Sequence, residues 1–211
     1  MFWRLIESPP SPIAFQMDRD RQVFEEFLQD AEGLPILRIF RVSEPGVSVG
    51  KRAAALEGTV PFSASSGKGD RLLFCIRPTG GGRVHHGKDF LYSVIARRDS
   101  FPTFQRVRTS YLSFHEVVQE ALRQLGVETS LVRCDDSRAR KNAKQGAIED
   151  CFGRPVPTDV CLGGRKIAGA AQWRRGNAFL HQGSIQIPAG ISFESLRPPF
   201  VKSFLDKFSI V

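Results

Sequence analysis

The fold is decided by the stretch from Thr158 to Ile187, TDVCLGGRKIAGAAQWRRGNAFLHQGSIQI. Short runs rich in apolar residues recur along it, and the Gly-Gly, Gly-Asn and Gln-Gly steps between the runs are typical of tight turns. This pattern predicts a meander of short strands over 158–162, 166–174, 178–182 and 184–187. His181 then lies beside a turn at Gln182-Gly183, where we expect a structural hydrogen bond rather than a catalytic role.

Two helical patterns lie upstream of this stretch. Apolar residues at helical spacing predict one helix over 12–30 and another over 113–125. Ser11 is the expected N-cap of the first helix, with Pro12 at its first helical position. Ser113 opens the second with the spacing of a capping box.

The remaining strand patterns and the tail complete the fold prediction. The tail from residue 192 onward predicts one or two short helices broken at Pro198-Pro199. Helices and strands are mixed without strict alternation, so we expect an α+β fold with a mixed, mostly antiparallel sheet flanked by helices. One domain over residues 1–211 is expected for a chain of this length. Further strands are predicted over 34–42, 46–51, 71–76, 90–96 and 129–134.

The composition is that of a basic globular protein. Neither a secretory signal nor an apolar run of about 18 residues is present, so we expect a cytoplasmic protein that does not enter a membrane. The net charge of +8 favours an acidic partner. The densest basic run, Ser137 to Gln145, has no aromatic residue to stack on bases. A solvated loop and a docking site for an acidic protein remain open, and nucleic acid is the least favoured partner.

The four cysteines lack the spacing of a metal site or a redox pair. No Cys-x-x-Cys, His-x-His, His-Glu-x-x-His or clustered Asp/Glu pattern is present, so no metal is expected. Free thiols in a reducing compartment more often serve packing than chemistry. That role is expected for Cys75, Cys134 and Cys161.

A glycine-rich segment, IRPTGGGRVHHG, spans residues 76–87. Consecutive glycines let the backbone approach a ligand, so that several N–H groups can face a carboxylate, phosphate or thioester oxygen. Arg77 offers a guanidinium there, and His85 or His86 offers a neutral donor or acceptor. A flexible hairpin turn is the open alternative. The segment is not a P-loop, because no Lys-Ser/Thr follows the glycines.

The remaining cysteine, Cys151, precedes Lys166 by fifteen positions across a Pro/Gly-rich connection. A neighbouring ammonium lowers the pKa of a thiol and makes it a better nucleophile at neutral pH. The carboxylates of Glu149 and Asp150 act in the opposite direction if they face the sulfur. The residues alone therefore leave two alternatives for Cys151, an activated nucleophile and a small buried hydrophobe.

Together, RPTGGGRVHHG and GGRKIAGAAQWRRGNAFLHQGSI resemble the biotin/lipoate A/B protein ligase superfamily, in particular its lipoate–protein ligase-like octanoyltransferase branch. That branch carries a glycine triplet followed by Val-x-His, then a Gly-Arg/Lys-Lys motif, then a His-x-Gly turn, in this order. The resemblance covers nearly the whole chain. It implies a catalytic domain like that of class II aminoacyl-tRNA synthetases and biotin ligases, without an accessory C-terminal domain.

The resemblance also implies a chemistry. Octanoyltransferases of this branch move octanoate from acyl carrier protein to a lipoyl domain, or to the H protein of the glycine cleavage system, through a cysteine thioester and without a cofactor. The branch places a Cys-Phe ahead of the lysine, and Cys151-Phe152 match it, with Asp159 in place of a glutamate. Cys151 and Lys166 are thus the implied catalytic residues, with Lys166 holding the thiolate.

The same resemblance implies the residues that bind the substrate. Ile76, Arg83, Ala170 and Asp150 depart from the branch pattern and bear on the acyl specificity and the acceptor. The implied oxyanion site and acyl-tunnel rim are formed around the glycine segment and the start of the lysine strand. The implied substrate-binding residues are Arg77, Thr79, Gly80, Gly81, Gly82, Arg83, Val84, His85, His86, Gly169 and Ala170.

Three alternatives remain beside the octanoyltransferase. An ATP- and Mg-dependent lipoate–protein ligase would use Lys166 to bind the acyl-adenylate and the glycines to hold the phosphate. An amidotransferase would pass octanoate between lipoyl proteins. A non-enzymatic module would bind acidic proteins or nucleic acid through the basic run.

Overall fold

The computed structural model describes residues 2–56, 64–65, 71–132 and 156–209. The helices are α1 (Ile13–Gln29), α2 (Lys51–Leu56), α3 (Val107–Arg123) and α4 (Phe193–Phe208), with a 3-10 turn at Pro102–Phe104. The strands are β1 (Arg4–Glu7), β2 (Ile36–Phe40), β3 (Gly46–Gly50), β4 (Ala64–Ser65), β5 (Arg71–Arg77), β6 (Arg83–His86), β7 (Asp89–Arg97), β8 (Ser130–Leu131), β9 (Val160–Leu162), β10 (Arg165–Arg175) and β11 (Ala178–Gln186).

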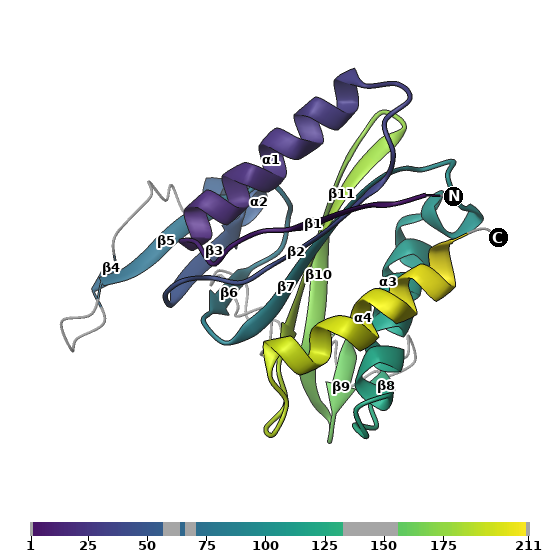
Figure 1. Cartoon of the computed structure of the whole chain (residues 1–211). Coiled ribbons are helices and arrows are strands. Elements are labelled where there is room, and N and C mark those ends of the chain that lie inside the picture. Colours follow the sequence, from purple (N-terminus) through teal and green to yellow (C-terminus); the bar gives the residue numbers. More distant parts are fainter. Residues whose placement is uncertain (1, 57–63, 66–70, 133–155, 210–211) are drawn as a thin grey trace.

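The described strands form two sheets (Figure 1). The larger sheet has the order β1-β2-β7-β11-β10-β9-β8, and the smaller has the order β4-β5-β3-β6. Neighbouring strands run antiparallel except in the pairs β1–β2 and β3–β5, which are parallel. The expected α+β fold, with mixed and mostly antiparallel sheets flanked by helices, is therefore confirmed.

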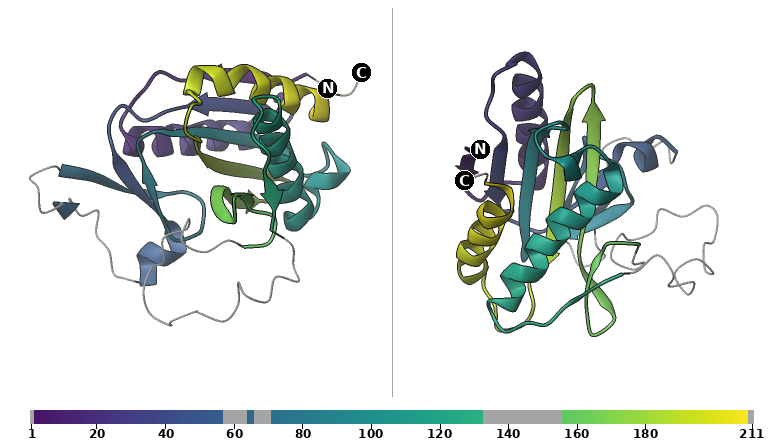
Figure 2. Two further views of the ribbon diagram at one scale, coloured as in Figure 1. Left: turned by 90° about the horizontal axis from the view of Figure 1, so that it is seen from below. Right: turned by 90° about the vertical axis from the view of Figure 1, so that its right-hand side faces the viewer.

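Helices cover both faces of the larger sheet, α3 and α4 on one face and α1 on the other (Figures 1 and 2). The alternation of side chains along β7 produces this arrangement. Phe90, Tyr92 and Val94 pack with residues of α3 and α4, whereas Leu91 and Ile95 pack with residues of α1. Because α1 also contacts β5, it joins the larger sheet to the smaller one and fixes the space between them.

The strands predicted over 34–42, 46–51, 71–76 and 90–96 are confirmed, with end shifts of a few residues. The prediction over 129–134 extends beyond the described residues, and its described part contains β8. The elements that were not expected from the sequence are β1, α2, β4, β6 and the 3-10 turn. β6 lies inside the glycine-rich segment and pairs with β3.

The meander differs from its prediction in one place. Residues 178–182 and 184–187 do not form two strands joined by a turn, because β11 runs unbroken from Ala178 to Gln186 and pairs throughout with β7. His181 accordingly lies within the strand, fully buried, and not beside a turn. Gly183 is required by packing: a Cβ at this position would overlap the ring of Tyr92.

Gly183→Ala should therefore lower the free energy of unfolding by about 1–3 kcal/mol, because the added methyl group overpacks the core against the Tyr92 ring. The measurement is urea unfolding followed by circular dichroism. Gly87→Ala is the matched control, since a Cβ at Gly87 meets no heavy atom within 4 Å. Equal stabilities of the two variants would contradict this account of Gly183.

Two helix starts were also predicted wrongly. α3 begins at Val107, six residues before Ser113, and the Ser113 hydroxyl donates to the Thr109 carbonyl at 2.8 Å inside the helix. α1 begins at Ile13 after Pro12 and has no side-chain cap, because the Ser11 hydroxyl donates backward to the Pro9 carbonyl. In both cases a serine with cap-like spacing bonds a neighbouring carbonyl instead.

The predicted break in the tail is wrong as well. α4 continues through Pro198 and Pro199 after a start at which the Ser192 hydroxyl accepts the Ser195 N–H at 3.1 Å. The prolines remove two backbone donors, but burial of the apolar face compensates, at about 1.5–3 kcal/mol for each large side chain. That face recurs every four residues and consists of Leu196, Phe200, Phe204 and Phe208.

Candidate functional site

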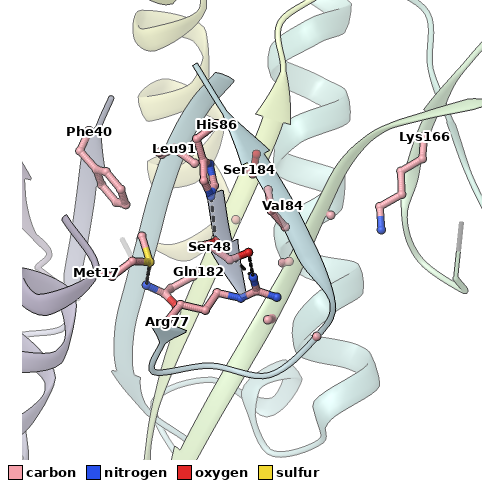
Figure 3. A pocket seen from close by; sticks show the side chains of 15 residues that line it. Met17, Phe40, Ser48, Arg77, Val84, His86, Leu91, Lys166, Gln182 and Ser184 are labelled. Atoms are coloured by element: carbon pink, nitrogen blue, oxygen red, sulfur yellow. Dashed lines mark hydrogen bonds between the residues drawn. The ribbon is translucent and has the colours of Figure 1, made fainter. Parts of the chain in front are cut away.

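A pocket opens between the two sheets, beneath α1 (Figure 3). The small sheet contributes β3, β5 and β6 to its wall, and the large sheet contributes β2, β7, β10 and β11. Apolar side chains supply much of this wall, and a few polar groups converge on it, which is the usual make-up of a small-molecule site. The lining residues are Met17, Phe40, Ser48, Arg77, Gly81, Val84, His86, Leu91, Lys166, Gly169, Ala170, Ala171, Gln182, Gly183 and Ser184.

The glycine-rich segment has a defined conformation because Arg77 binds it. The guanidinium donates to the Gly80 carbonyl from Nε at 3.0 Å and from Nη2 at 2.6 Å. The Lys51 N–H donates to the Thr79 carbonyl at 3.1 Å, and Gly81 adopts a φ of 93°. A Cβ at Gly50 would overlap the backbone at Gly80 and Gly81, so this close approach requires glycine. Arg77 therefore positions the segment as part of the pocket wall.

A chain of hydrogen bonds joins three strands at the pocket. His86 Nε2 lies 2.8 Å from Ser48 Oγ, and His86 Nδ1 lies 2.7 Å from Asp89 Oδ2 (the first of these is drawn in Figure 3). Ser184 Oγ and the Gly87 N–H also donate to the Asp89 carboxylate, at 2.8 and 3.1 Å. Burial by itself raises the pKa of Asp89, but these three donors outweigh it, and the pKa lies below its ordinary value. Asp89 is therefore a carboxylate.

Lys166 extends from β10 toward the same pocket (Figure 3). Its ammonium pairs with Asp159 Oδ2 at 2.8 Å, and both side chains are buried. The Val156 N–H donates to the same carboxylate oxygen at 2.7 Å. A Cβ at Gly169 would lie 2.6 Å from Lys166 Cε and 2.8 Å from Nζ, so the glycine gives the lysine its space. The result is a positive charge held in a fixed place on the pocket wall.

The turn that carries Asp159 is itself constrained. Thr158 adopts a φ of 81°, in the left-handed region, which costs a β-branched residue about 1–3 kcal/mol. His115 Nδ1 donates to the Thr158 carbonyl at 2.6 Å. Burial lowers the pKa of His115, so the ring is neutral and donates from Nδ1.

A second buried network anchors the opposite wall. Thr79 Oγ1 donates to Gln182 Oε1 at 2.7 Å, and Gln182 Nε2 donates to Asp20 Oδ2 at 2.6 Å. Asp20 pairs with Arg38 at 2.7 Å, and both side chains are fully buried. The network links the glycine-rich segment to α1, β2 and β11 through these side chains.

The structure brings seven of the predicted site residues onto the pocket wall: Arg77, Gly81, Val84, His86, Lys166, Gly169 and Ala170. Thr79 and Gly80 lie behind this wall and contact it through the hydrogen bonds above. Gly82 and Arg83 are half-buried outside the lining, and His85 is exposed, because alternate residues of β6 face opposite ways. Cys151 and Cys134 lie outside the described residues.

Two cysteines, Cys75 and Cys161, are described, and both are buried. Burial raises the pKa of the Cys75 thiol to about 12, so it stays protonated at neutral pH. These positions agree with the packing role that the sequence predicts for Cys75 and Cys161.

In the described ranges no group of three or more His, Cys, Asp or Glu side chains is arranged to hold a metal ion. Nor does any described helix combine the length and apolar character needed to span a bilayer.

Sequence reasoning missed several polar residues of the site. Ser48, Asp89 and Gln182 lie on three different strands and form no local motif. The only signal was a polar side chain at a buried position of an otherwise apolar strand, as in Val-Ser-Val around Ser48. Only the sheet order brings these positions together.

Stability should fall as the pH drops below about 6.5, and His181 should account for part of the fall. Burial lowers the pKa of His181 well below its ordinary value of 6.5, and the charge of Arg174 lowers it further. The unfolded chain therefore binds a proton that the folded protein does not, at a cost of about 1.4 kcal/mol per pH unit. The measurement is urea unfolding between pH 7 and pH 5.

His181→Gln should reduce the pH slope of the unfolding free energy. The exposed His85 provides the control, since His85→Gln should leave the slope unchanged. Parallel pH profiles for the parent protein and His181→Gln would contradict the assignment.

Comparison with known proteins places these features in a family context. The family described as the lipoyl protein ligase A/B catalytic domain matches residues 12–193. A protein named octanoyltransferase LipM from Moorella thermoacetica is 31% identical over 183 residues, which are 87% of this chain and 64% of the relative. Another of the same name from Kyrpidia tusciae is 32% identical over 184 residues, 87% of this chain and 65% of the relative. The chain thus spans just under two thirds of these relatives.

Solved structures show the same fold. A crystal structure of lipoate-protein ligase A bound with ATP superposes with a TM-score of 0.68 at 19% identity, covering 98% of this chain and 85% of that one. A bipartite lipoate protein ligase from Thermoplasma acidophilum, studied with its E2 lipoyl domain, gives a TM-score of 0.66 at 18% identity, covering 100% and 85%.

Proposed function

The chain belongs to the lipoyl protein ligase A/B catalytic domain family, and we propose that it is an octanoyltransferase of lipoate biosynthesis. It takes an octanoyl group from octanoyl-acyl carrier protein and passes it to a lysine of a lipoyl domain or of the glycine cleavage H protein, in the cytoplasm. Relatives named octanoyltransferase at 31–32% identity support the reaction class. The donor, the acceptor and the thioester route rest on the motif around Cys151 and Lys166.

The observation that carries the proposal is the buried ammonium of Lys166. It is held by Asp159 on the wall of a pocket that Met17, Phe40, Val84 and Leu91 make largely apolar. An apolar pocket suits an eight-carbon acyl chain, and a fixed cation suits a thiolate or the oxyanion of a thioester under attack. These two features together support acyl transfer.

The proposed reaction has two steps. The thiolate of Cys151 attacks the octanoyl thioester, an S–C bond forms, and the carrier protein leaves as a thiolate that takes up a proton. The lysine amine of the acceptor, once deprotonated, then attacks the octanoyl-Cys151 carbonyl. The C–N bond of the amide forms, the C–S bond breaks, the nitrogen releases a proton to water, and the Cys151 thiolate is regenerated. Lys166 stabilises the thiolate in both steps, and backbone N–H groups around Gly81 and Gly169 face the developing oxyanion.

The charge of the chain suits this use. The net charge of +8 attracts acidic protein partners and raises their rate of encounter. Acyl carrier proteins and lipoyl domains are acidic in type, so both substrates of the proposed reaction would be attracted.

No cofactor enters the proposed reaction. The main alternative function is that of an ATP- and Mg-dependent lipoate–protein ligase. An amidotransferase would differ from the proposed enzyme only in its acyl donor.

Transfer assays with purified proteins test the proposal. The protein is incubated with octanoyl carrier protein and a lipoyl domain, with and without ATP and Mg, and octanoylation is followed by intact mass. We expect octanoylation without ATP, its loss in Cys151→Ala, and its retention in Cys161→Ala, a matched change at a buried thiol. Octanoylation that requires ATP, or that survives in Cys151→Ala, would contradict the proposal. Faster octanoyl transfer from an octanoylated lipoyl protein than from octanoyl carrier protein would indicate the amidotransferase.

A further inference from the structure

The second step of the proposed reaction requires a base. The amine of a lysine has a pKa of about 10.4 and arrives as an ammonium without a lone pair, so it must lose a proton before it can attack. Lys166 does not serve, because it is paired as an ammonium with the Asp159 carboxylate. The inference that follows rests on the proposed function and concerns the group that takes this proton.

With a neutral His86 ring, the hydrogen-bond chain at the pocket has one consistent set of proton positions. The Asp89 carboxylate only accepts, so His86 donates to it from Nδ1 and keeps a lone pair on Nε2. The Ser48 hydroxyl is 2.8 Å from Nε2 and therefore donates to it. Ser184 and the Gly87 N–H also donate to Asp89 and hold the carboxylate in place. In this arrangement every proton of the hydrogen-bond chain is directed toward Asp89, and the Ser48 hydroxyl, at the pocket end, can accept a hydrogen bond.

Arg77 sets the orientation of the serine. Its Nη1 lies 3.2 Å from Ser48 Oγ and 3.1 Å from the Ser48 carbonyl, so an N–H of Arg77 occupies one lone pair of the hydroxyl. The hydroxyl hydrogen then points to His86 Nε2, and the second lone pair remains to accept an N–H from a substrate. Ser48 and His86 line the same pocket as Lys166, across from it in Figure 3.

We infer that Ser48, His86 and Asp89 form a relay that removes the proton from the acceptor ammonium. The ammonium gives a proton to Ser48 Oγ while Ser48 gives its own to His86 Nε2. One N–H bond breaks and one O–H bond forms at the serine, and one O–H bond breaks and one N–H bond forms at the histidine. The free amine then attacks the thioester carbonyl. As the C–S bond breaks, the nitrogen loses its second proton to water and Cys151 leaves as a thiolate. The first proton returns from His86 through Ser48 to water. Asp89 stabilises the transient imidazolium.

The relay accounts for features that packing alone does not require. Burying polar side chains costs desolvation free energy that apolar residues filling the same space would not. Even so, five polar side chains converge here: Ser48, Arg77, His86, Asp89 and Ser184. The charged groups that face His86 from neighbouring elements are Arg77 on β5, Asp89 on β7 and Lys166 on β10. Of these, Asp89 makes a direct hydrogen bond with the ring, at 2.7 Å.

The test isolates the second step. Octanoyl-enzyme is formed with octanoyl carrier protein, separated from the donor, and mixed with the lipoyl domain, with ethylamine, or with 2,2,2-trifluoroethylamine. Both amines are small, but at neutral pH ethylamine is an ammonium and trifluoroethylamine is mainly a free base. Loss of octanoyl-enzyme is followed by intact mass for the parent, Asp89→Asn, Ser48→Ala and Asp99→Asn. Asp99 is an exposed carboxylate just beyond the other end of β7, so Asp99→Asn repeats the chemical change outside the site.

Asp89→Asn and Ser48→Ala should slow transfer to the lipoyl domain and to ethylamine by about 10²-fold or more. The loss with trifluoroethylamine should be at least about tenfold smaller, because this amine needs no deprotonation before attack. Asp99→Asn should match the parent. Parent-like rates in both site variants, or equal losses with the two amines, would overturn the relay and indicate a structural role. A parent that forms no octanoyl-enzyme would overturn the proposed function, and the relay would fall with it.

A spectroscopic measurement tests the relay without any transfer. The ¹⁵N chemical shifts of His86 should show a neutral ring protonated on Nδ1 in the parent protein, and they should change in Asp89→Asn. A ring protonated on Nε2 in the parent would overturn the relay even if octanoyl transfer is intact. Ser48→Ala keeps the Asp89 contact, so it should retain the Nδ1 proton and thereby show that the fold survives.

Discussion

Lys166→Met combined with Asp159→Asn should slow octanoyl transfer by about 10²- to 10³-fold, which is the usual effect of removing one group that stabilises an oxyanion. The double change removes both charges of a buried pair, and such replacements are often neutral for stability. The folded protein should therefore persist while the pocket loses its cation. The measurement is the single-turnover rate of octanoyl-enzyme formation, with urea unfolding to check stability.

The single variants distinguish charge from packing. Asp159→Asn alone keeps the ammonium of Lys166 and the acceptor of the Val156 N–H, so its loss of rate should be far smaller than that of the double variant. Lys166→Met alone leaves a buried carboxylate unpaired and should also destabilise the fold, by about 3–5 kcal/mol. A double variant that acylates at the parent rate would contradict the role given to Lys166.

Asp20→Ala should lower the free energy of unfolding by about 3–5 kcal/mol. The carboxylate accepts hydrogen bonds from Arg38, Ser93 and Gln182, at 2.7, 2.7 and 2.6 Å. Its removal leaves the Arg38 guanidinium fully buried without its counter-charge. Burial lowers the pKa of Arg38, and without Asp20 the charged form would be still less favourable. Urea unfolding measures the effect.

An exposed ion pair provides the comparison. Lys202 and Asp206 on α4 approach to 2.5 Å, but their side chains are 66% and 61% exposed. Solvent screens such a pair, so Asp206→Ala should change the free energy of unfolding by no more than about 1 kcal/mol. Similar effects of Asp20→Ala and Asp206→Ala would show that the buried network does not hold α1 to the sheet.

The sequence predicted the fold best where periodicity was strong. The strands β2, β3, β5 and β7 follow from their apolar runs, and α+β mixing follows from their order. The errors arose where a residue had a use that the local pattern does not reveal. Gly183 was interpreted as a turn residue, but it is glycine because the Tyr92 ring occupies the space of a side chain.

The helix errors have the same origin. Ser113 has the spacing of a cap but lies inside α3, because the helix begins six residues earlier, at Val107, and buries Ser110 in its first turns. Pro198 and Pro199 predicted a break, but the aromatic face of α4 is buried deeply enough to carry the helix through them. Tertiary packing outweighed local preference in each case.

The site was predicted in part. The motifs led to Arg77, His86 and Lys166, which the structure brings to one pocket. Ser48 and Asp89 were beyond the reach of sequence reasoning, because the hydrogen bonds that give them meaning cross between strands of two sheets.

The most direct test of the central claim is to map the site of acylation. The protein is incubated with octanoyl carrier protein alone, without ATP or acceptor, then digested, and its peptides are analysed by mass spectrometry. The account predicts one octanoyl group on Cys151 that hydroxylamine removes. An octanoyl group on Cys75 or Cys161 instead, or efficient transfer with no acylated cysteine at any time, would contradict it.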